Sequence, residues 1–265
     1  RKKPEKSKSN LFLLHAGSGE INNYKKLCGY LNASCWGIRI GSKEITPKNI
    51  TINQLAGEYV NMIKEIQPNG PYTLGGWCIG GTTAFEMANI LEQMGDKVDF
   101  IFLFNSISPK DWPDIKPFSL DTEIHLVRSF FGKEAAVQAE KYKDINELWE
   151  SIADKKIEKA RIIKQLPGDV RDAIPDVEKL ETIDLLMYVN RIRTMHQARA
   201  LYKPQRSLNA QIIFFNAVYD NIITDKELNI STWNSYCNAE IIKIDLPSNH
   251  YTMFDEPVVF ELASK

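Results

Sequence analysis

Residues 70–91 read GPYTLGGWCIGGTTAFEMANIL, and this stretch decides the fold. An apolar run leads into GWCIG at positions 76–80, and apolar residues then recur at helical spacing. A strand, a Gly-x-nucleophile-x-Gly turn and a helix, in that order, hold one reactive side chain on a sharp turn at a helix N-terminus. In this chain that side chain is the thiol of Cys78.

This arrangement is the nucleophile elbow of α/β-hydrolases, with Cys78 where serine is usual. A cysteine at a helix N-terminus has a lowered pKa, so more of it is thiolate. The alternative is a structural cysteine in a glycine-rich turn. The strand before the turn and the helix after it favour a nucleophile.

The rest of the chain predicts an α/β-hydrolase fold, a mostly parallel sheet flanked by helices, with a helical lid insertion. Apolar side chains in residues 52–66 recur at helical spacing. The run at 100–104 is apolar throughout, which is typical of a strand covered on both faces. Short apolar runs predict strands at 11–14, 35–40, 72–74, 100–104, 212–215 and 241–244.

Between about 110 and 204 the alternation of strands and helices breaks, and the sequence is charged and helix-like. We interpret this insertion as a lid over the site; the alternative is a separate helical domain with no role in the chemistry. Its amphipathic stripe is expected to form core more than to contact substrate. The stripe consists of Leu185, Leu186, Val189, Ile192 and Met195.

The chain has 265 residues with 33 basic and 34 acidic side chains, a balance that argues against nucleic-acid or membrane-surface partners. No apolar run reaches the ~20 residues of a membrane helix. Residues 1–9 lack a signal peptide's apolar region. Because residue 1 is Arg and not Met and this segment is charged, we expect a flexible linker from an upstream carrier domain, and a domain that is monomeric when excised from a longer protein. The alternative is a processed start.

Four cysteines lie at positions 28, 35, 78 and 237, without the short spacing of zinc or redox sites. We therefore expect no metal, and a reducing cytoplasm as the setting. Cys28, Cys35 and Cys237 have apolar neighbours and are expected to be small core residues.

The general base of such a fold comes last in the chain. His250 lies just after the final predicted strand and before a C-terminal helix, which is where this fold places its base. His15 follows the first strand, near the expected oxyanion loop. His125 and His196 fall in the helical insertion and are expected to be structural.

An acid after the strand that follows the elbow would stand at position 105, which is Asn105. In a serine triad, replacing Asp by Asn costs about 10⁴ in rate, because the imidazole takes the wrong tautomer. A Cys–His pair can instead form thiolate and imidazolium, and an Asn carbonyl can accept the second imidazolium N–H. We expect Asn105 to orient His250 in this way, with Asp220 as the alternative third member.

An oxyanion hole needs two backbone N–H groups. One comes from the residue after the nucleophile, Ile79, and the other from the loop after the first strand, where Gly17 is the best candidate. The alternative for Gly17 is an ordinary turn glycine.

These segments together resemble a terminal thioesterase domain of a nonribosomal peptide synthetase or peptide/polyketide hybrid synthetase. The resemblance covers roughly residues 10–262, and the segment 110–196 matches only as a helical lid. It rests on LFLLHAGSG (11–19), GPYTLGGWCIGG (70–81), AFEMA (84–88), ARALYKP (198–204) and HYTM (250–253).

The resemblance implies the domain's chemistry in natural-product biosynthesis. A peptidyl or acyl chain arrives as a thioester on the phosphopantetheine of an upstream carrier domain in the same polypeptide, and the thioesterase domain itself, residues 10–265, holds no cofactor. The nucleophile takes the chain, and water or an internal hydroxyl or amine releases it. The family usually has an acid where this chain has Asn105, and a proline where it has Ala16.

Cys78 keeps the acyl group as a thioester, so transfer from the carrier is nearly isoenergetic. This retained activation favours amine attack or strained-ring closure, and we expect macrolactam or lactone formation, with hydrolysis as the other release. The alternatives are a stand-alone editing thioesterase and a degenerate domain that only binds the carrier. A small hydrolase of the dienelactone type is disfavoured by the long insertion.

Overall fold

The computed structural model describes residues 9–41, 46–109, 115–131, 141–153, 159–166, 171, 174 and 176–265. Residues 1–8 of the expected linker lie outside the described residues. Contacts within the chain divide it into two compact units. The first comprises residues 1–40, 51–111 and 199–265, and the second comprises 41–50 and 112–198.

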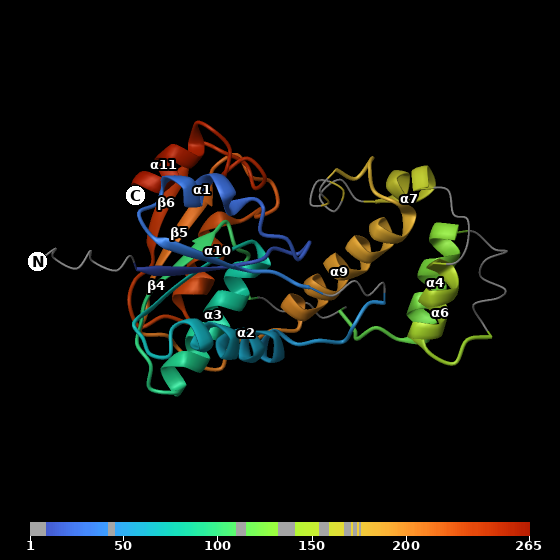
Figure 1. Ribbon diagram of the computed structural model, residues 1–265, viewed down its shortest axis with the longest axis horizontal. Coiled ribbons are helices and arrows are strands. Elements are labelled where there is room, and N and C mark those ends of the chain that lie inside the picture. The colour runs from blue at the N-terminus through green and yellow to red at the C-terminus, as the bar shows by residue number, and fades with distance from the viewer. Residues whose placement is uncertain are drawn as a thin grey trace, which may run out of the picture. The chain divides into compact units, whose positions relative to one another are not determined.

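The first unit is built on a six-stranded sheet in the order β2-β1-β3-β4-β5-β6, and every strand pair is parallel (Figure 1). Helices connect the strands, so the predicted α/β-hydrolase architecture is confirmed. The strands are β1 (Asn10–Leu14), β2 (Ser34–Ile38), β3 (Tyr72–Trp77), β4 (Val98–Phe104), β5 (Gln211–Ala217) and β6 (Ile242–Leu246).

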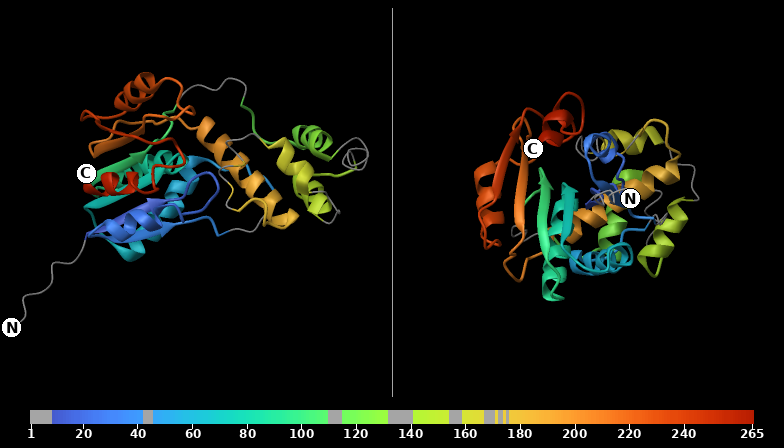
Figure 2. Two further views of the ribbon diagram at one scale, coloured as in Figure 1. Left: turned by 90° about the horizontal axis from the view of Figure 1, so that it is seen from above. Right: turned by 60° about the vertical axis from the view of Figure 1, so that its left-hand side comes forward.

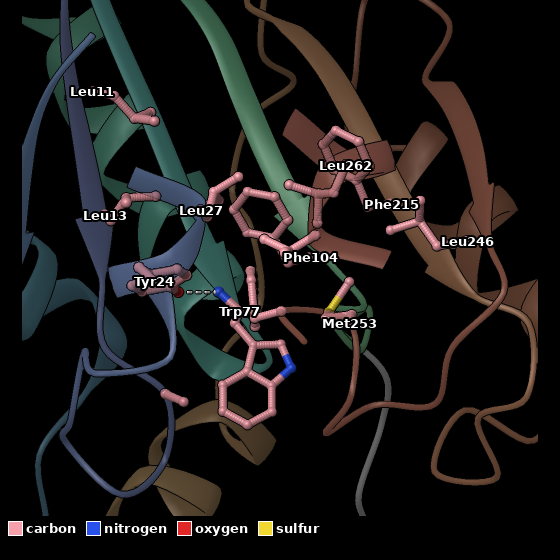
Figure 3. Packing of buried hydrophobic residues seen from close by; sticks show 13 residues of the cluster. Leu11, Leu13, Tyr24, Leu27, Trp77, Phe104, Phe215, Leu246, Met253 and Leu262 are labelled. Atoms are coloured by element: carbon pink, nitrogen blue, oxygen red, sulfur yellow. Dashed lines mark hydrogen bonds between the residues drawn. The ribbon is translucent and has the colours of Figure 1, made fainter. Parts of the chain in front are cut away.

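One face of this sheet packs against α1 (Tyr24–Tyr30) and α11 (Val258–Ser264). Alternate strand residues point to the same face, and here they form a buried apolar cluster (Figure 3). Leu27 of α1 and Leu262 of α11 join it from the helices. The sequence predicted the C-terminal helix but not α1.

The other face packs against α2 (Ile52–Ile66), α3 (Ile79–Gln93) and α10 (Lys226–Asn234). Figure 2 shows the chain from two further sides. Thr51 and Gln54 form a reciprocal capping box that fixes the start of α2. Phe85 of α3 and Trp233 of α10 meet with ring centroids 5.1 Å apart, which ties these two helices together.

The expectation that β4 is covered on both faces is wrong at its start. Phe100, Phe102 and Phe104 share one face, and Phe100 and Phe102 stack with centroids 6.3 Å apart. Phe100 is 42% exposed whereas Phe104 is 2% exposed. On this face, β4 is therefore fully buried only towards its carboxyl end.

The second unit contains α4 (Leu120–Phe131), α6 (Ile145–Ala153), α7 (Lys159–Gln165) and most of α9 (Thr182–Ala200). The five residues of its apolar stripe are all buried, as core residues are. Glu123 is fully buried and accepts hydrogen bonds from Arg193 Nη2 at 2.6 Å and Trp149 Nε1 at 3.0 Å. That this unit acts as a lid stays a prediction.

Within the described part of the chain, no helix has both the length and the apolar character needed to cross a bilayer.

Candidate active site

Cys78 stands at the turn between β3 and α3, with φ 57° and ψ −123°. A non-glycine residue in this conformation is strained and is held only where its surroundings fix it. A Cβ on Gly76 would lie 2.0 Å from the backbone of Gly80, so the turn requires glycine there. The Cys78 N–H donates to the Phe104 carbonyl at 3.1 Å and ties the turn to β4.

Trp77 braces the elbow from both sides. Its backbone N–H donates to the Tyr24 hydroxyl at 2.7 Å, drawn in Figure 3, and that hydroxyl donates to the Leu14 carbonyl at 2.8 Å. The Trp77 indole Nε1 donates to the His250 carbonyl at 3.0 Å, and the two rings lie 4.9 Å apart. Sequence reasoning assigned Trp77 and Tyr24 no role, because these bonds join distant segments.

His250 lies in the loop after β6 and is 3% exposed. Asn249 shapes this loop: its Oδ1 accepts the backbone N–H groups of Tyr251 at 2.9 Å and Thr252 at 3.0 Å. A short polar side chain that bonds the backbone two residues on is a common way to form such a turn. The His250 ring is therefore held by its own loop and by Trp77.

Asn105 follows β4 directly, has φ 45° and is fully buried. Its Nδ2 lies 2.9 Å from His250 Nδ1, and its Oδ1 accepts the Ala217 N–H at 3.2 Å. The structure thus brings together the two side chains that the sequence paired.

Asp220 follows β5, and its carboxylate contacts the same Asn105 nitrogen that faces His250. Its Oδ2 accepts Asn105 Nδ2 at 2.8 Å, and its two oxygens accept the N–H groups of Ile222 and Ile223 at 3.1 Å each. The two candidates for the third member are therefore joined in series. Among the described contacts, the partner of His250 Nδ1 is Asn105 and not Asp220.

One expectation is wrong in this network. The amide nitrogen of Asn105 faces the imidazole, where its carbonyl was expected. The cause is Asp220, because a carboxylate oxygen accepts hydrogen bonds and would repel an amide oxygen in the same place. The Ala217 N–H favours the same orientation by donating to the amide oxygen.

The half-buried Cys78 thiol is acidified. Burial raises its pKa, but the charge and hydrogen bond of His250, the charge of Arg199 and the Ile79 N–H outweigh this and lower the pKa below its ordinary value. Since Nδ1 of His250 faces Asn105, the ring nitrogen left for Cys78 is Nε2. The result is a thiol biased towards thiolate, as a nucleophile requires.

Arg199 is a site residue that sequence reasoning named only within a motif. It is 8% exposed, and burial lowers the pKa of its guanidinium. The turn that follows it is anchored on α3, because Tyr202 donates to the buried carboxylate of Glu86 at 2.6 Å. The sequence signal that could have identified Arg199 is its position as a charged residue between two alanines at the end of a helix.

The expected oxyanion groups lie on neighbouring segments. The Ile79 N–H is already directed at the Cys78 sulfur. The loop that contains Gly17 begins beside the elbow: a Cβ on Gly80 would lie 2.6 Å from the Leu14 carbonyl oxygen and 2.7 Å from that of His15. Their oxyanion role stays a prediction.

The remaining histidines and cysteines have other surroundings. His15 is buried, and its ring nitrogens lie 2.7 Å from the Tyr59 hydroxyl and 2.7 Å from the Ala16 carbonyl. His125 is exposed on α4.

Cys28 is half-buried; burial and a hydrogen bond with Cys35 raise its pKa to about 12. The described residues contain no group of His, Cys, Asp and Glu suited to a metal ion.

Comparison with known proteins identifies the family. A family model described as "Thioesterase domain" matches residues 9–255. A similar curated relative, "Inactive atromentin synthetase invA4" of Paxillus involutus, is 28% identical over 255 residues, 94% of this chain and 25% of the relative. "Aspulvinone E synthetase melA" of Aspergillus terreus is 24% identical over 266 residues, 96% of this chain and 27% of the relative. The chain thus spans about a quarter of the length of these relatives.

Solved structures show the same fold. The NocB thioesterase domain, in covalent complex with a fluorophosphonate nocardicin G analog, has a TM-score of 0.63 and 20% identity over 97% of this chain and 91% of that one. The RedJ thioesterase of Streptomyces coelicolor has a TM-score of 0.62 and 16% identity over 97% of this chain and 85% of that one. With the elbow, the parallel sheet and the matched residues taken together, the chain belongs to the thioesterase domain family.

Proposed function

We propose that this domain is a chain-releasing thioesterase. It takes a peptidyl or acyl group from a phosphopantetheinyl carrier domain onto Cys78 and releases it by cyclisation, as a macrolactam or lactone, or by hydrolysis. The observation that carries the proposal is the acidified Cys78 thiol, held in a strained elbow beside the buried His250. No resident cofactor is needed for this chemistry.

Acyl transfer follows from the geometry. The Cys78 thiolate attacks the carrier thioester, a C–Sγ bond forms, and the bond to the pantetheine sulfur breaks. The departing thiolate takes a proton from solvent, and the N–H groups of Ile79 and Gly17 are proposed to bind the developing oxyanion. Because one thioester replaces another, the acyl group remains activated for the release step.

The carrier partner is supported by the relatives. The chain resembles a part of a four-domain nonribosomal peptide synthetase, with a TM-score of 0.66 and 21% identity over 97% of this chain and 19% of that one. We propose an upstream carrier domain in the same polypeptide, and a monomeric state for the domain when excised. A nucleophilic thiol also requires reducing surroundings, so we place the protein in the cytoplasm.

A second candidate is a degenerate domain that binds the carrier domain but has only weak thioesterase activity. It is favoured by relatives that are named inactive, among them the one at 28% identity. The lowered pKa of Cys78 beside His250 favours the enzyme. An editing thioesterase, which hydrolyses misacylated carriers, differs from both in preferring short acyl groups.

The test uses the purified domain and a peptidyl N-acetylcysteamine thioester, with intact-protein mass spectrometry and product analysis. We expect an acyl adduct that the Cys78→Ala variant lacks, and a cyclic or linear released product. Absence of both adduct and turnover would favour the binding domain, and fast hydrolysis of acetyl over peptidyl thioesters would favour editing. If wild type and Cys78→Ser give the same linear acid at similar rates, the cyclisation proposal fails.

A further inference from the structure

The orientation of one amide group governs what His250 can do. Asn105 Nδ2 donates to Asp220 Oδ2 at 2.8 Å, and Asn105 Oδ1 accepts the Ala217 N–H at 3.2 Å. If the amide were rotated by 180°, its oxygen would face the Asp220 carboxylate and its N–H₂ group would face the Ala217 N–H. Both hydrogen bonds would then be lost. Because Asn105 and Asp220 are buried, water cannot replace these two hydrogen bonds.

This orientation selects a tautomer of the imidazole. An amide N–H₂ can only donate, so His250 Nδ1, 2.9 Å away, is stable as an acceptor. The neutral ring then carries its proton on Nε2, the nitrogen directed at Cys78. In this form the ring supports a thiolate by donating a hydrogen bond to it from Nε2.

The same tautomer is a poor general base. In this tautomer Nε2 has no free lone pair, so it cannot accept the proton of an attacking water molecule. In serine triads, an Asn in the acid position imposes this tautomer and lowers kcat by about 10⁴. Acylation here does not depend on that base, because the Cys78 pKa is lowered in part by Arg199 as well as by His250. Attack by water on the acyl group does depend on it.

We infer that Asn105, oriented by Asp220, is a positioning residue that suppresses hydrolysis of the acyl group on Cys78 and leaves release to nucleophiles that need no general base. A neutral amine is such a nucleophile. Its nitrogen bonds to the acyl carbon, the C–Sγ electron pair returns to sulfur, and the ammonium proton passes to solvent. Water needs a base to take its proton as the C–O bond forms. The inference rests on the proposed function of Cys78.

The decisive variant exchanges the two positioning side chains, N105D/D220N. The new carboxylate at position 105 would then accept the proton of His250 Nδ1. The new amide at position 220 would donate to that carboxylate, at the cost of the bond from the Ile223 N–H. Changing Asn105 alone would set two carboxylates against each other. The matched control is N216D/D245N, because Asn216 Nδ2 donates to Asp245 Oδ1 at 2.6 Å between β5 and β6 in the same way.

The measurement is the decay of acyl-Cys78 in water after excess N-acetylcysteamine thioester has been removed, followed by intact mass. We expect N105D/D220N to hydrolyse its adduct about 10²–10⁴-fold faster than wild type and the control. Butylamine should convert the wild-type adduct to amide. Equal decay in all three proteins overturns the inference and leaves the proposed function standing, whereas absence of a wild-type adduct overturns both.

A second measurement does not depend on how the variant folds. In wild type with ¹⁵N-labelled histidine rings, two-bond ¹H–¹⁵N correlation spectra report which ring nitrogen carries the proton, and H250N assigns the signals. A proton on Nε2 of neutral His250 supports the inference. A proton on Nδ1 overturns it, whatever the fate of the acyl group.

Discussion

The indole Nε1 of Trp77 donates a 3.0 Å hydrogen bond to the backbone carbonyl of His250, so the residue before the nucleophile holds the loop that carries the site's imidazole. Trp77→Phe removes this donor and leaves a buried carbonyl unpaired, which costs about 1–3 kcal/mol. We expect a lower midpoint in urea unfolding and a fall in kcat/KM larger than the stability loss explains. Trp36→Phe, at an exposed indole, is the control; equal effects in the two variants would contradict the bracing role.

Replacing Cys78 by serine should nearly abolish acyl transfer. An alcohol is not acidified enough to react without a base, and His250 carries its proton on the wrong nitrogen. We expect a loss on the order of 10⁴ in acylation rate. The triple variant C78S/N105D/D220N should recover a large part of that loss as hydrolysis. A single C78S variant as active as wild type would show that His250 already acts as a base.

Alkylation of Cys78 should remain fast at pH values below those at which an ordinary thiol reacts. Because the pKa of Cys78 is lowered, the thiolate remains the main form as the pH falls, until the pH drops below that lowered pKa. Arg199→Gln removes one positive charge that favours the thiolate, and should move the midpoint of the iodoacetamide rate profile to higher pH.

Two variants calibrate that experiment. Arg199→Lys keeps the charge and should retain most of the effect, and Arg206→Gln removes an exposed charge and should change nothing. Cys28 and Cys237 do not interfere, because burial raises the pKa of each to about 12. A profile unchanged by Arg199→Gln would leave His250 and the Ile79 N–H as the source of the acidity.

Stability of the helical unit should depend on Glu123. This carboxylate is fully buried and pairs with Arg193, whose side chain is 24% exposed. Glu123→Ala should cost about 3 kcal/mol, the lower end for broken buried pairs, because Arg193 keeps access to water. Thermal unfolding measures this, with Glu150→Ala on the exposed surface of α6 as the control. A loss below about 1 kcal/mol would mean that the pair behaves as a surface ion pair.

The fold and the positions of Cys78 and His250 could be predicted because each depends on a short segment. The elbow needs only its glycines and flanking apolar runs, and His250 needs only its place after the last strand. Asn105 could be named from its position, but the direction of its amide could not. That direction is set by Asp220, which the order of strands in the sheet brings alongside. The exposure of Phe100 likewise depends on where the covering helices end.

Cys78, Asn105, Asp220 and His250 follow β3, β4, β5 and β6, four strands that are consecutive in the sheet as well as along the chain. A chain emerging from the ribosome therefore presents the thiol long before it can present the imidazole of His250. Until the sixth strand has docked, Cys78 lacks the imidazole that acidifies it. A chain without β6 therefore holds a less acidic thiol at Cys78, and the full nucleophile forms only when the last strand completes the sheet.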